Sequence, residues 1–224
     1  MKLLLFIICT VTAATTACKL EALSGSRNSN ANSNQATAST STSTPVTQSN
    51  CSLTMTAAPL LEGIKLGMTP DEVLALLPGS KDDPEVQAKL AKPPSPLGVS
   101  DFIVQADKLQ PKEKFAGIKH FSFSLLDGRI SSINISYNGP AYAHVDEFVS
   151  KFIEGTSLPP VDQWQAYVGM DTQLKTLTCK DFEVRVFAGG PGGSLNYVLI
   201  TNLEANKQLK ERRAKAKAQA TPKQ

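Results

Sequence analysis

The chain has 224 residues, of which 41% are hydrophobic and 19% are charged, and its formal net charge is +3. The length allows one ordinary domain or two small ones with tails, and the hydrophobic share excludes a wholly disordered chain. No apolar run approaches the roughly 20 residues that span a bilayer, which excludes a polytopic membrane protein. A charge of +3 does not indicate a nucleic-acid binder, and we expect no nucleic-acid partner.

Residues 1–17 are predicted to be a secretory signal peptide. Lys2 provides a short positive start, Leu3 to Val11 form an apolar stretch, and small residues follow up to Cys18. This stretch is too short for a stable membrane anchor. The alternative is a short buried N-terminal helix, but no pattern of a folded domain follows for about 40 residues.

Cys18 resembles the lipidated cysteine of a bacterial lipobox, because the small residue Ala17 directly precedes it. Thr15 departs from that pattern, which usually has Leu, Val or Ile there. We expect a lipid on Cys18 because of this resemblance and the long polar segment that follows it. Its acyl chains would contribute about 0.8 kcal/mol per buried CH₂ to membrane binding. The protein is then anchored in the bacterial cell envelope, in the periplasm or at the outer membrane. Ordinary cleavage after Ala17 instead gives a free secreted protein.

Residues 18–50 are predicted to be a disordered tether. Ser24 to Asn50 consist mostly of Ser, Thr, Asn and Gln, with Val46 as the single large aliphatic residue. Such a segment buries too little apolar surface to offset the entropy of ordering the chain. As a flexible coil it spans roughly 30 Å. In a eukaryote, the same Ser/Thr run is alternatively an O-glycosylated stalk.

The folded domain is predicted over residues 51–206, and its first helix follows Thr69. Thr69 is a good N-cap, Glu72 completes a capping box, and Pro78-Gly79 ends the helix. Residues 80–96 are charged and then rich in proline, which predicts a long loop.

A β-hairpin is predicted next, after a strand near residues 99–104. Apolar and small polar residues alternate on both sides of Asp127-Gly128, which is a preferred two-residue turn. The apolar members are Phe121, Phe123, Leu125, Ile133, Ile135 and Tyr137. The polar members, which we call the polar set, are His120, Ser122, Ser124, Ser132, Asn134 and Ser136.

A second helix is predicted over residues 144–154, where the apolar positions form one helical stripe. A short helical turn at 162–167 would bury Trp164, and three strands follow at 174–179, 182–188 and 195–203. The predicted fold class is α+β: a mainly antiparallel sheet with two or three helices packed on one face, in a single domain.

The polar set is the candidate partner-binding face of the sheet. Short side chains leave a flat platform that a partner can cover, and an edge strand can accept a partner strand. The alternative is that the set forms only the solvated side of an antiparallel sheet.

Cys51 and Cys179 are predicted to form one disulfide if the protein enters an oxidising compartment. Two independent buried thiols are the alternative. A catalytic role for Cys179 is not expected, because a nucleophilic thiol needs an activating base and the chain has only two histidines.

No motif indicates catalysis, a metal site or a cofactor, and we expect none. His120 and His144 lack partners at metal-ligand spacing. The glycine-rich segment 188–194 lacks the Lys-Ser/Thr of a phosphate loop, so it is interpreted as a flexible hairpin loop. The carboxylate pairs at 82–83 and 146–147 are interpreted as solvated surface and a favourable helix start.

Residues 207–224 are predicted to be a basic disordered tail, with seven Lys/Arg against one Asp/Glu. Residues 51–206 carry 13 Lys/Arg and 18 Asp/Glu and are mildly acidic. The tail is either only a solubilising segment or a contact to an anionic lipid or envelope polymer, to which each basic residue near a charged membrane contributes about 1 kcal/mol.

Residues Gly67-Met68-Thr69-Pro70-Asp71-Glu72-Val73, together with Leu76-Leu77-Pro78-Gly79, resemble the start of small envelope lipoproteins of the SmpA/OmlA group. In that group the helix ends in Gly-Pro, whereas here the order is Pro78-Gly79. The β-lactamase-inhibitor-like secreted modules have a similar layout. The resemblance implies a small α+β module of helices on an antiparallel sheet that makes protein contacts and is not catalytic.

These observations together predict a non-enzymatic cell-envelope lipoprotein, in which a flexible tether presents one α+β interaction module to an envelope protein. The alternatives are a free secreted ligand-binding or inhibitor protein and an enzyme with unrecognised chemistry.

Overall fold

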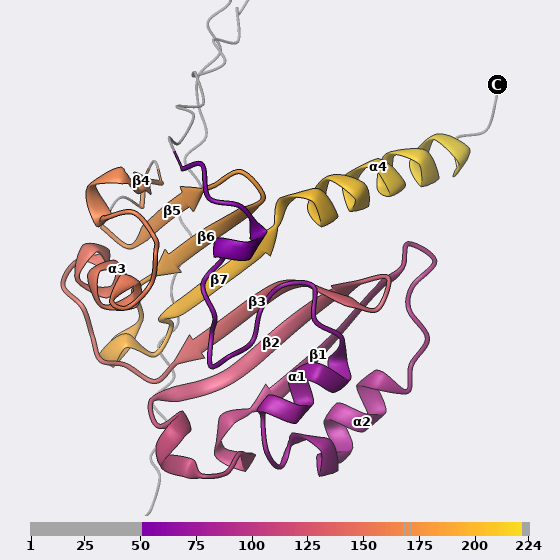
Figure 1. Cartoon of the computed structure of the whole chain (residues 1–224), viewed down its shortest axis with the longest axis horizontal. Helices are drawn as coiled ribbons and strands as arrows, with labels where there is room; N and C mark the ends of the chain where they lie inside the picture. Colours follow the sequence, from indigo (N-terminus) through magenta and orange to yellow (C-terminus); the bar gives the residue numbers. More distant parts are fainter. Residues whose placement is uncertain (1–50, 168, 171, 221–224) are drawn as a thin grey trace, which may run out of the picture. The chain divides into compact units, whose positions relative to one another are not determined.

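Seven antiparallel strands form one sheet in the order β1-β2-β3-β7-β6-β5-β4 (Figure 1). The computed structural model describes residues 51–167, 169–170 and 172–220. The predicted signal, the tether with Cys18 and the last four residues lie outside them. The strands are β1 Val99–Gln105, β2 Ile118–Leu126, β3 Arg129–Tyr137, β4 Gln165–Ala166, β5 Leu174–Thr178, β6 Phe182–Phe187 and β7 Tyr197–Asn202.

Helices α1 (Pro70–Leu76), α2 (Pro84–Leu90) and α3 (Val145–Ile153) contribute apolar side chains to the core on one face of the sheet, which we call the first face. Val73, Val86 and Val149 from these helices are fully buried there. The strands supply Phe102, Phe121, Phe123, Ile133, Ile135, Val184, Val186, Val198 and Ile200. The predicted α+β fold is therefore confirmed.

The predicted hairpin forms with the expected turn. Leu126 ends β2 and Arg129 begins β3, so Asp127 and Gly128 are the two loop residues. Their φ angles of 51° and 75° are both positive, as a type I′ turn requires. The turn fixes the pairing of β2 with β3 and therefore which side chains share a face.

Both sequence-predicted helices are capped, the first by the predicted capping box. Thr69 and Glu72 form the capping box of α1. The ring nitrogen Nδ1 of His144 accepts a hydrogen bond from the Asp146 N–H (3.2 Å) and caps α3. Gly155 follows α3 with φ 73°, the left-handed conformation that commonly ends a helix.

The prediction of a loop throughout 80–96 is wrong, because α2 lies within it. Asp83 caps this helix by accepting the Glu85 N–H (2.9 Å), and Pro84 occupies the first helical position. Val86 anchors the helix in the core. Helix α2 has only two turns, too short for its apolar periodicity to stand out in the sequence.

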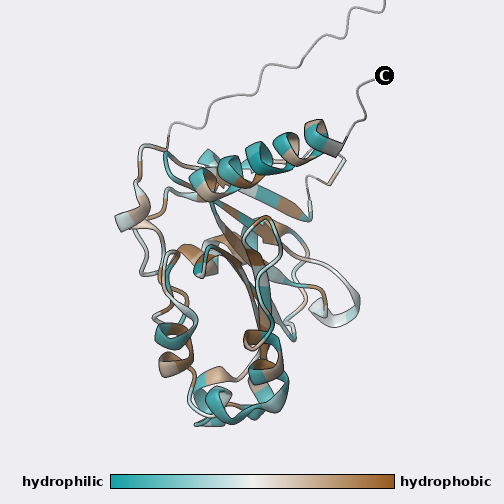
Figure 2. Cartoon of the chain, turned by 90° about the vertical axis from the view of Figure 1, so that its right-hand side faces the viewer, coloured by the Kyte–Doolittle hydropathy of each residue, from teal (hydrophilic) through white to brown (hydrophobic). Residues whose placement is uncertain are grey.

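The prediction of a disordered tail at 207–224 is wrong for residues 207–220, which belong to helix α4 (Leu203–Ala220). Asn202 Oδ1 accepts the Ala205 N–H (3.0 Å) at its start. Arg212, two turns later, is held by residues of the domain. In Figure 2, α4 is hydrophilic along most of its length, and it lacks the apolar stripe from which a helix is normally predicted.

The predicted disulfide between Cys51 and Cys179 is present. It joins the start of the described chain to the turn between β5 and β6. Two hydrogen bonds support this junction: Lys180 N–H donates to Leu53 O (3.1 Å), and Met55 N–H donates to Asp181 Oδ2 (3.0 Å). Such a bond is compatible with an oxidising, extracellular or envelope location.

Candidate functional site

The polar set lies on the opposite side of the sheet from the core, which we call the second face. It forms three cross-strand pairs between β2 and β3: His120 with Ser136, Ser122 with Asn134, and Ser124 with Ser132. Their apolar neighbours in sequence point into the core, because successive side chains of a strand alternate between faces. The structure therefore brings all six residues together on one surface.

Other strands extend the second face well beyond the polar set. The register places Ile103 beside Ser122, Leu199 beside Asn134, and Thr201 beside Ser132. Arg185 follows beside Leu199. The alternation of apolar and polar residues within β6 and β7 is visible in the sequence. The order of these strands in the sheet depends on long-range pairing, and that order places them beside the polar set.

The centre of the second face has little charge. Burial and the neighbouring Lys119 lower the pKa of His120, which favours its neutral form near pH 7. Asn134 Oδ1 is buried and accepts no hydrogen bond from the described part of the chain. Buried polar atoms in folded proteins are usually hydrogen-bonded, often to an ordered water.

Charged and aromatic groups surround the polar set on the second face. Arg185 forms an ion pair with Glu183 (2.7 Å) on β6. Asp101 on the edge strand β1 pairs with Lys89 of α2 (3.1 Å). The rings of Phe187 and Tyr197 stack with a centroid separation of 5.3 Å.

Helix α4 covers one end of the second face. Ala205 and Leu209 lie beside Ser124, Ser132 and Thr201 around a hollow of about 290 Å³. A second hollow of about 330 Å³, lined by Arg129, Gln208 and their neighbours, lies along the same helix. The centre of the polar set is outside both hollows.

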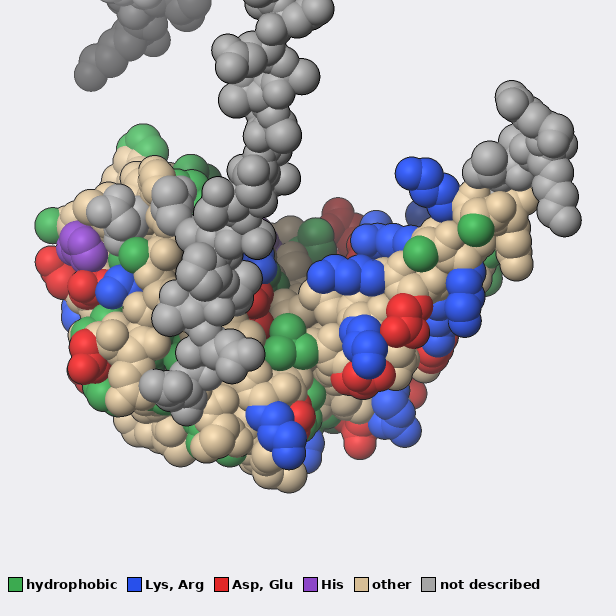
Figure 3. All heavy atoms as spheres, turned by 90° about the horizontal axis from the view of Figure 1, so that it is seen from above, with side chains coloured by type: hydrophobic (Ala, Val, Ile, Leu, Met, Phe, Trp, Pro, Cys, Tyr) green, Lys and Arg blue, Asp and Glu red, His purple; other side chains and the backbone are tan. Residues whose placement is uncertain are grey.

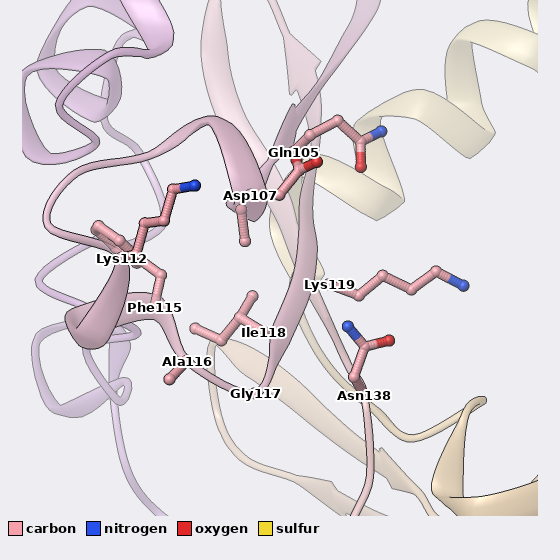
Figure 4. A pocket seen from close by; sticks show the side chains of 10 residues that line it. Gln105, Asp107, Lys112, Phe115, Ala116, Gly117, Ile118, Lys119 and Asn138 are labelled. Carbon is pink, nitrogen blue, oxygen red and sulfur yellow. The ribbon is translucent and has the colours of Figure 1, made fainter. Parts of the chain in front are cut away.

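Another hollow, of about 410 Å³, lies at the other end of β2 (Figure 4). Phe115 and Ile118 contribute its apolar part, and Lys112 and Lys119 lie on opposite sides with their ammonium groups apart. Asp107 contributes its one carboxylate. The lining contains no histidine, cysteine or serine and brings no acid, base and nucleophile together.

The remaining sequence candidates have structural roles. His144 caps α3. It lies on a different element from His120, and the two histidines do not belong to a common set of metal ligands within the described residues. No group of three or more His, Cys, Asp or Glu side chains within the described ranges could hold a metal ion. Cys179 is bonded to Cys51 and is not available as a nucleophile.

The glycine-rich segment 188–194 is better ordered than the predicted flexible loop. Asn196 accepts the Gly189 N–H (3.0 Å) and donates to Pro140 O (2.7 Å), which ties the segment to the chain after β3. Gly193 has φ 79°, and a Cβ there would collide with Pro140 O. Glycine is therefore required for close backbone packing.

The predicted solvated surface holds for Asp82, and Asp146 and Glu147 lie in the first turn of α3 as predicted, but Asp83 departs from the prediction. Asp83 is almost fully buried and pairs with Lys108 (3.0 Å), whose hydrogen bond lowers the pKa of that carboxyl. Asp146 at the start of α3 pairs with Lys175 of β5 (3.0 Å). The ion pairs Asp83–Lys108 and Asp146–Lys175 connect helices to other elements, and they do not converge on one site.

Comparisons with known proteins leave the function open. No family model and no curated protein matches the chain. A solved structure of a cysteine-rich secretory protein from Staphylococcus aureus is similar over 48% of this chain and 36% of that one, with 12% identity and a TM-score of 0.25. This chain thus aligns with only about a third of that protein's length. Within the described ranges, no helix has the length and apolar character needed to cross a bilayer.

Proposed function

We propose that the chain is an exported lipoprotein of the bacterial cell envelope, whose folded domain binds another envelope protein and catalyses no reaction. The binding role is inferred from the second face of the sheet. Helices α1, α2 and α3 pack on the first face, and α4 reaches only one end of the second. Ser122 and Asn134, in the middle of the polar set, lie outside the hollows along α4 and are partly exposed, so a partner can reach them.

The shape and charge of the second face suit a protein partner. Its serine side chains allow the partner's backbone or flat side chains to approach closely. The neutral polar set is easily desolvated, whereas Arg185, Glu183 and Asp101 provide polar contacts around it.

Export and anchoring draw support from separate features. The disulfide suits an oxidising compartment, and the apolar stretch before Cys18 has the pattern of a secretory signal. Residues 67–79, which resemble the SmpA/OmlA group, supply α1 and its capping box. In this proposal the lipid on Cys18 holds the domain at the membrane through residues 18–50.

Site-specific photo-crosslinking in the native envelope tests the binding role. A photoreactive residue is placed at Ser122 or at Asn134, and for comparison at Ser150, which is exposed on α3 across the sheet. We expect a discrete crosslinked protein from the first two positions and none from Ser150. Equal crosslinking from all three positions, or none from any, contradicts the assignment of the second face.

Anchoring is tested on the processed N-terminus. We expect mass spectrometry to find an acylated Cys18 and detergent partitioning to place the protein in the detergent phase. An unmodified Cys18 in a protein that stays in the aqueous phase supports the alternative, a free secreted ligand-binding or inhibitor protein.

A further inference from the structure

Helix α4 concentrates positive charge outside a domain of opposite charge. It carries Lys207, Lys210, Arg212, Arg213, Lys215 and Lys217 against Glu204 and Glu211. Lys207, Lys210 and Arg213, spaced three residues apart, lie close to one side of the helix. All three are exposed and none forms an ion pair within the described residues. Unneutralised, closely spaced cations attract an anionic surface.

The helix is held to the domain at Arg212. Its guanidinium donates to both carboxylate oxygens of Asp127 (2.8 and 2.6 Å) and to Leu97 O (2.9 Å). Gly98 leaves room for this arrangement, because a Cβ there would collide with Asp127 Oδ1. The cations of α4 therefore occupy a defined place on the domain.

The base of α4 and the start of the domain meet at one residue. Asp181 accepts the Met55 N–H through its side chain (3.0 Å) and the Leu203 N–H through its backbone oxygen (3.0 Å). The Cys51–Cys179 disulfide lies two residues away. The chain that leads to Cys18 thus enters the domain at the corner from which α4 leaves it.

We propose that α4 lies on the anionic phospholipid headgroups of the membrane that carries the lipid anchor. Figure 3 shows the domain from above, with the Lys and Arg side chains of α4 spread over this side. The tether enters the domain at Cys51, beside the base of α4. Three basic residues at such a surface contribute on the order of a hundredfold in binding. The orientation rests on the proposed function, but the affinity of α4 for anionic lipid does not.

Vesicle binding by an unacylated protein tests the proposal. The sample is the processed chain 18–224 with Cys18→Ser, mixed with vesicles of phosphatidylcholine and phosphatidylglycerol or of phosphatidylcholine alone. We expect flotation with the anionic vesicles only, and release as salt rises, since salt screens exposed charges. Absence of flotation, or equal flotation with both vesicles, overturns the proposal.

Two triple variants with the same change in net charge locate the effect. Lys207→Glu, Lys210→Glu and Arg213→Glu should weaken binding on the order of a hundredfold. The control variant combines Lys81→Glu, Lys112→Glu and Lys119→Glu, which alter exposed residues away from α4. It should weaken vesicle binding much less. An equal loss in both variants overturns the role of α4. Circular dichroism checks that each variant is folded.

The outcomes separate this proposal from the proposed function. If Cys18 is acylated in cells but the unacylated protein ignores anionic vesicles, the anchor stands and the role of α4 fails. If Cys18 is unmodified but the vesicles are bound through α4, the lipid anchor fails and the helix contact stands. Binding instead to an acidic protein, with none to vesicles, also overturns the lipid assignment.

Discussion

Arg212 and Asp127, which are 85 residues apart in sequence, form a two-point ion pair with distances of 2.8 and 2.6 Å. Asp127 is also the first residue of the turn between β2 and β3. The pair connects the middle of α4 to the hairpin that carries the polar set. The hydrogen bond and charge of Arg212 lower the pKa of Asp127, so the carboxylate is the stable form near neutral pH.

Arg212→Ala should loosen α4 without unfolding the sheet. The variant removes the bonds to Asp127 and Leu97, and the helix has little apolar contact to replace them. We expect faster amide hydrogen exchange in residues 205–216 and nearly unchanged exchange in β2 and β3. Lys210→Ala, which removes an exposed cation with no ion pair, is the control. Unchanged exchange in α4 of the Arg212 variant would contradict this role.

The disulfide should contribute strongly to the stability of the domain. Its closed loop has a sequence separation of 128 residues, and the chain-entropy model assigns about 4–5 kcal/mol to such a loop. We expect the double variant Cys51→Ser and Cys179→Ser to lose about this amount of unfolding free energy in urea. Adding reductant should lower the stability of the unmodified protein and leave the variant unchanged. Recovery of both cysteines as free thiols from the native protein would refute the pairing.

The two faces of β3 should respond differently to truncation. Ile133 is fully buried against the core, so Ile133→Ala should cost about 2–5 kcal/mol. Its neighbour Ser132 points to the second face, and Ser132→Ala should change stability by about 0.5 kcal/mol or less. Urea unfolding of the two variants measures the difference. Similar losses would be inconsistent with the assigned register.

Acid should destabilise the domain through Asp83. Its pKa is lowered from the ordinary value of 3.8, first by the hydrogen bond from Lys108. A lowered folded pKa means that the stabilising effect is present above the unfolded pKa and is lost as pH falls through the folded one. Unfolding free energies measured from pH 6 to pH 2 should therefore fall at the acid end.

Asp83→Asn keeps an N-cap but removes the titrating group, so the acid-side decrease should become shallower. Asp82→Asn is the matched control, because the Asp82 side chain makes no hydrogen bond or ion pair within the described residues. A pH profile that Asp83→Asn leaves unchanged would exclude Asp83 as a source of the acid sensitivity.

Local sequence patterns determined much of this protein. Thr69 and Glu72 specify the start of α1, Asp127-Gly128 specifies the hairpin turn, and strand alternation places Ser122 and Asn134 on one face. Each of these signals acts within a few residues, through capping bonds, allowed φ values or the two-residue strand period. They were sufficient to predict the fold class and the polar set.

Tertiary structure alone decided the surroundings of that polar set. Helix α4 has no apolar stripe, and its position depends on Arg212 reaching Asp127 across 85 residues. The convergence of Met55 and Leu203 on Asp181 likewise requires the sheet to be assembled. Such contacts depend on which distant strands become neighbours, and no short-range periodicity encodes that. The net charge of +3 describes neither the acidic domain nor the basic segment after it, which the sequence already separates. Only the folded chain shows that this segment is a helix held at Asp127.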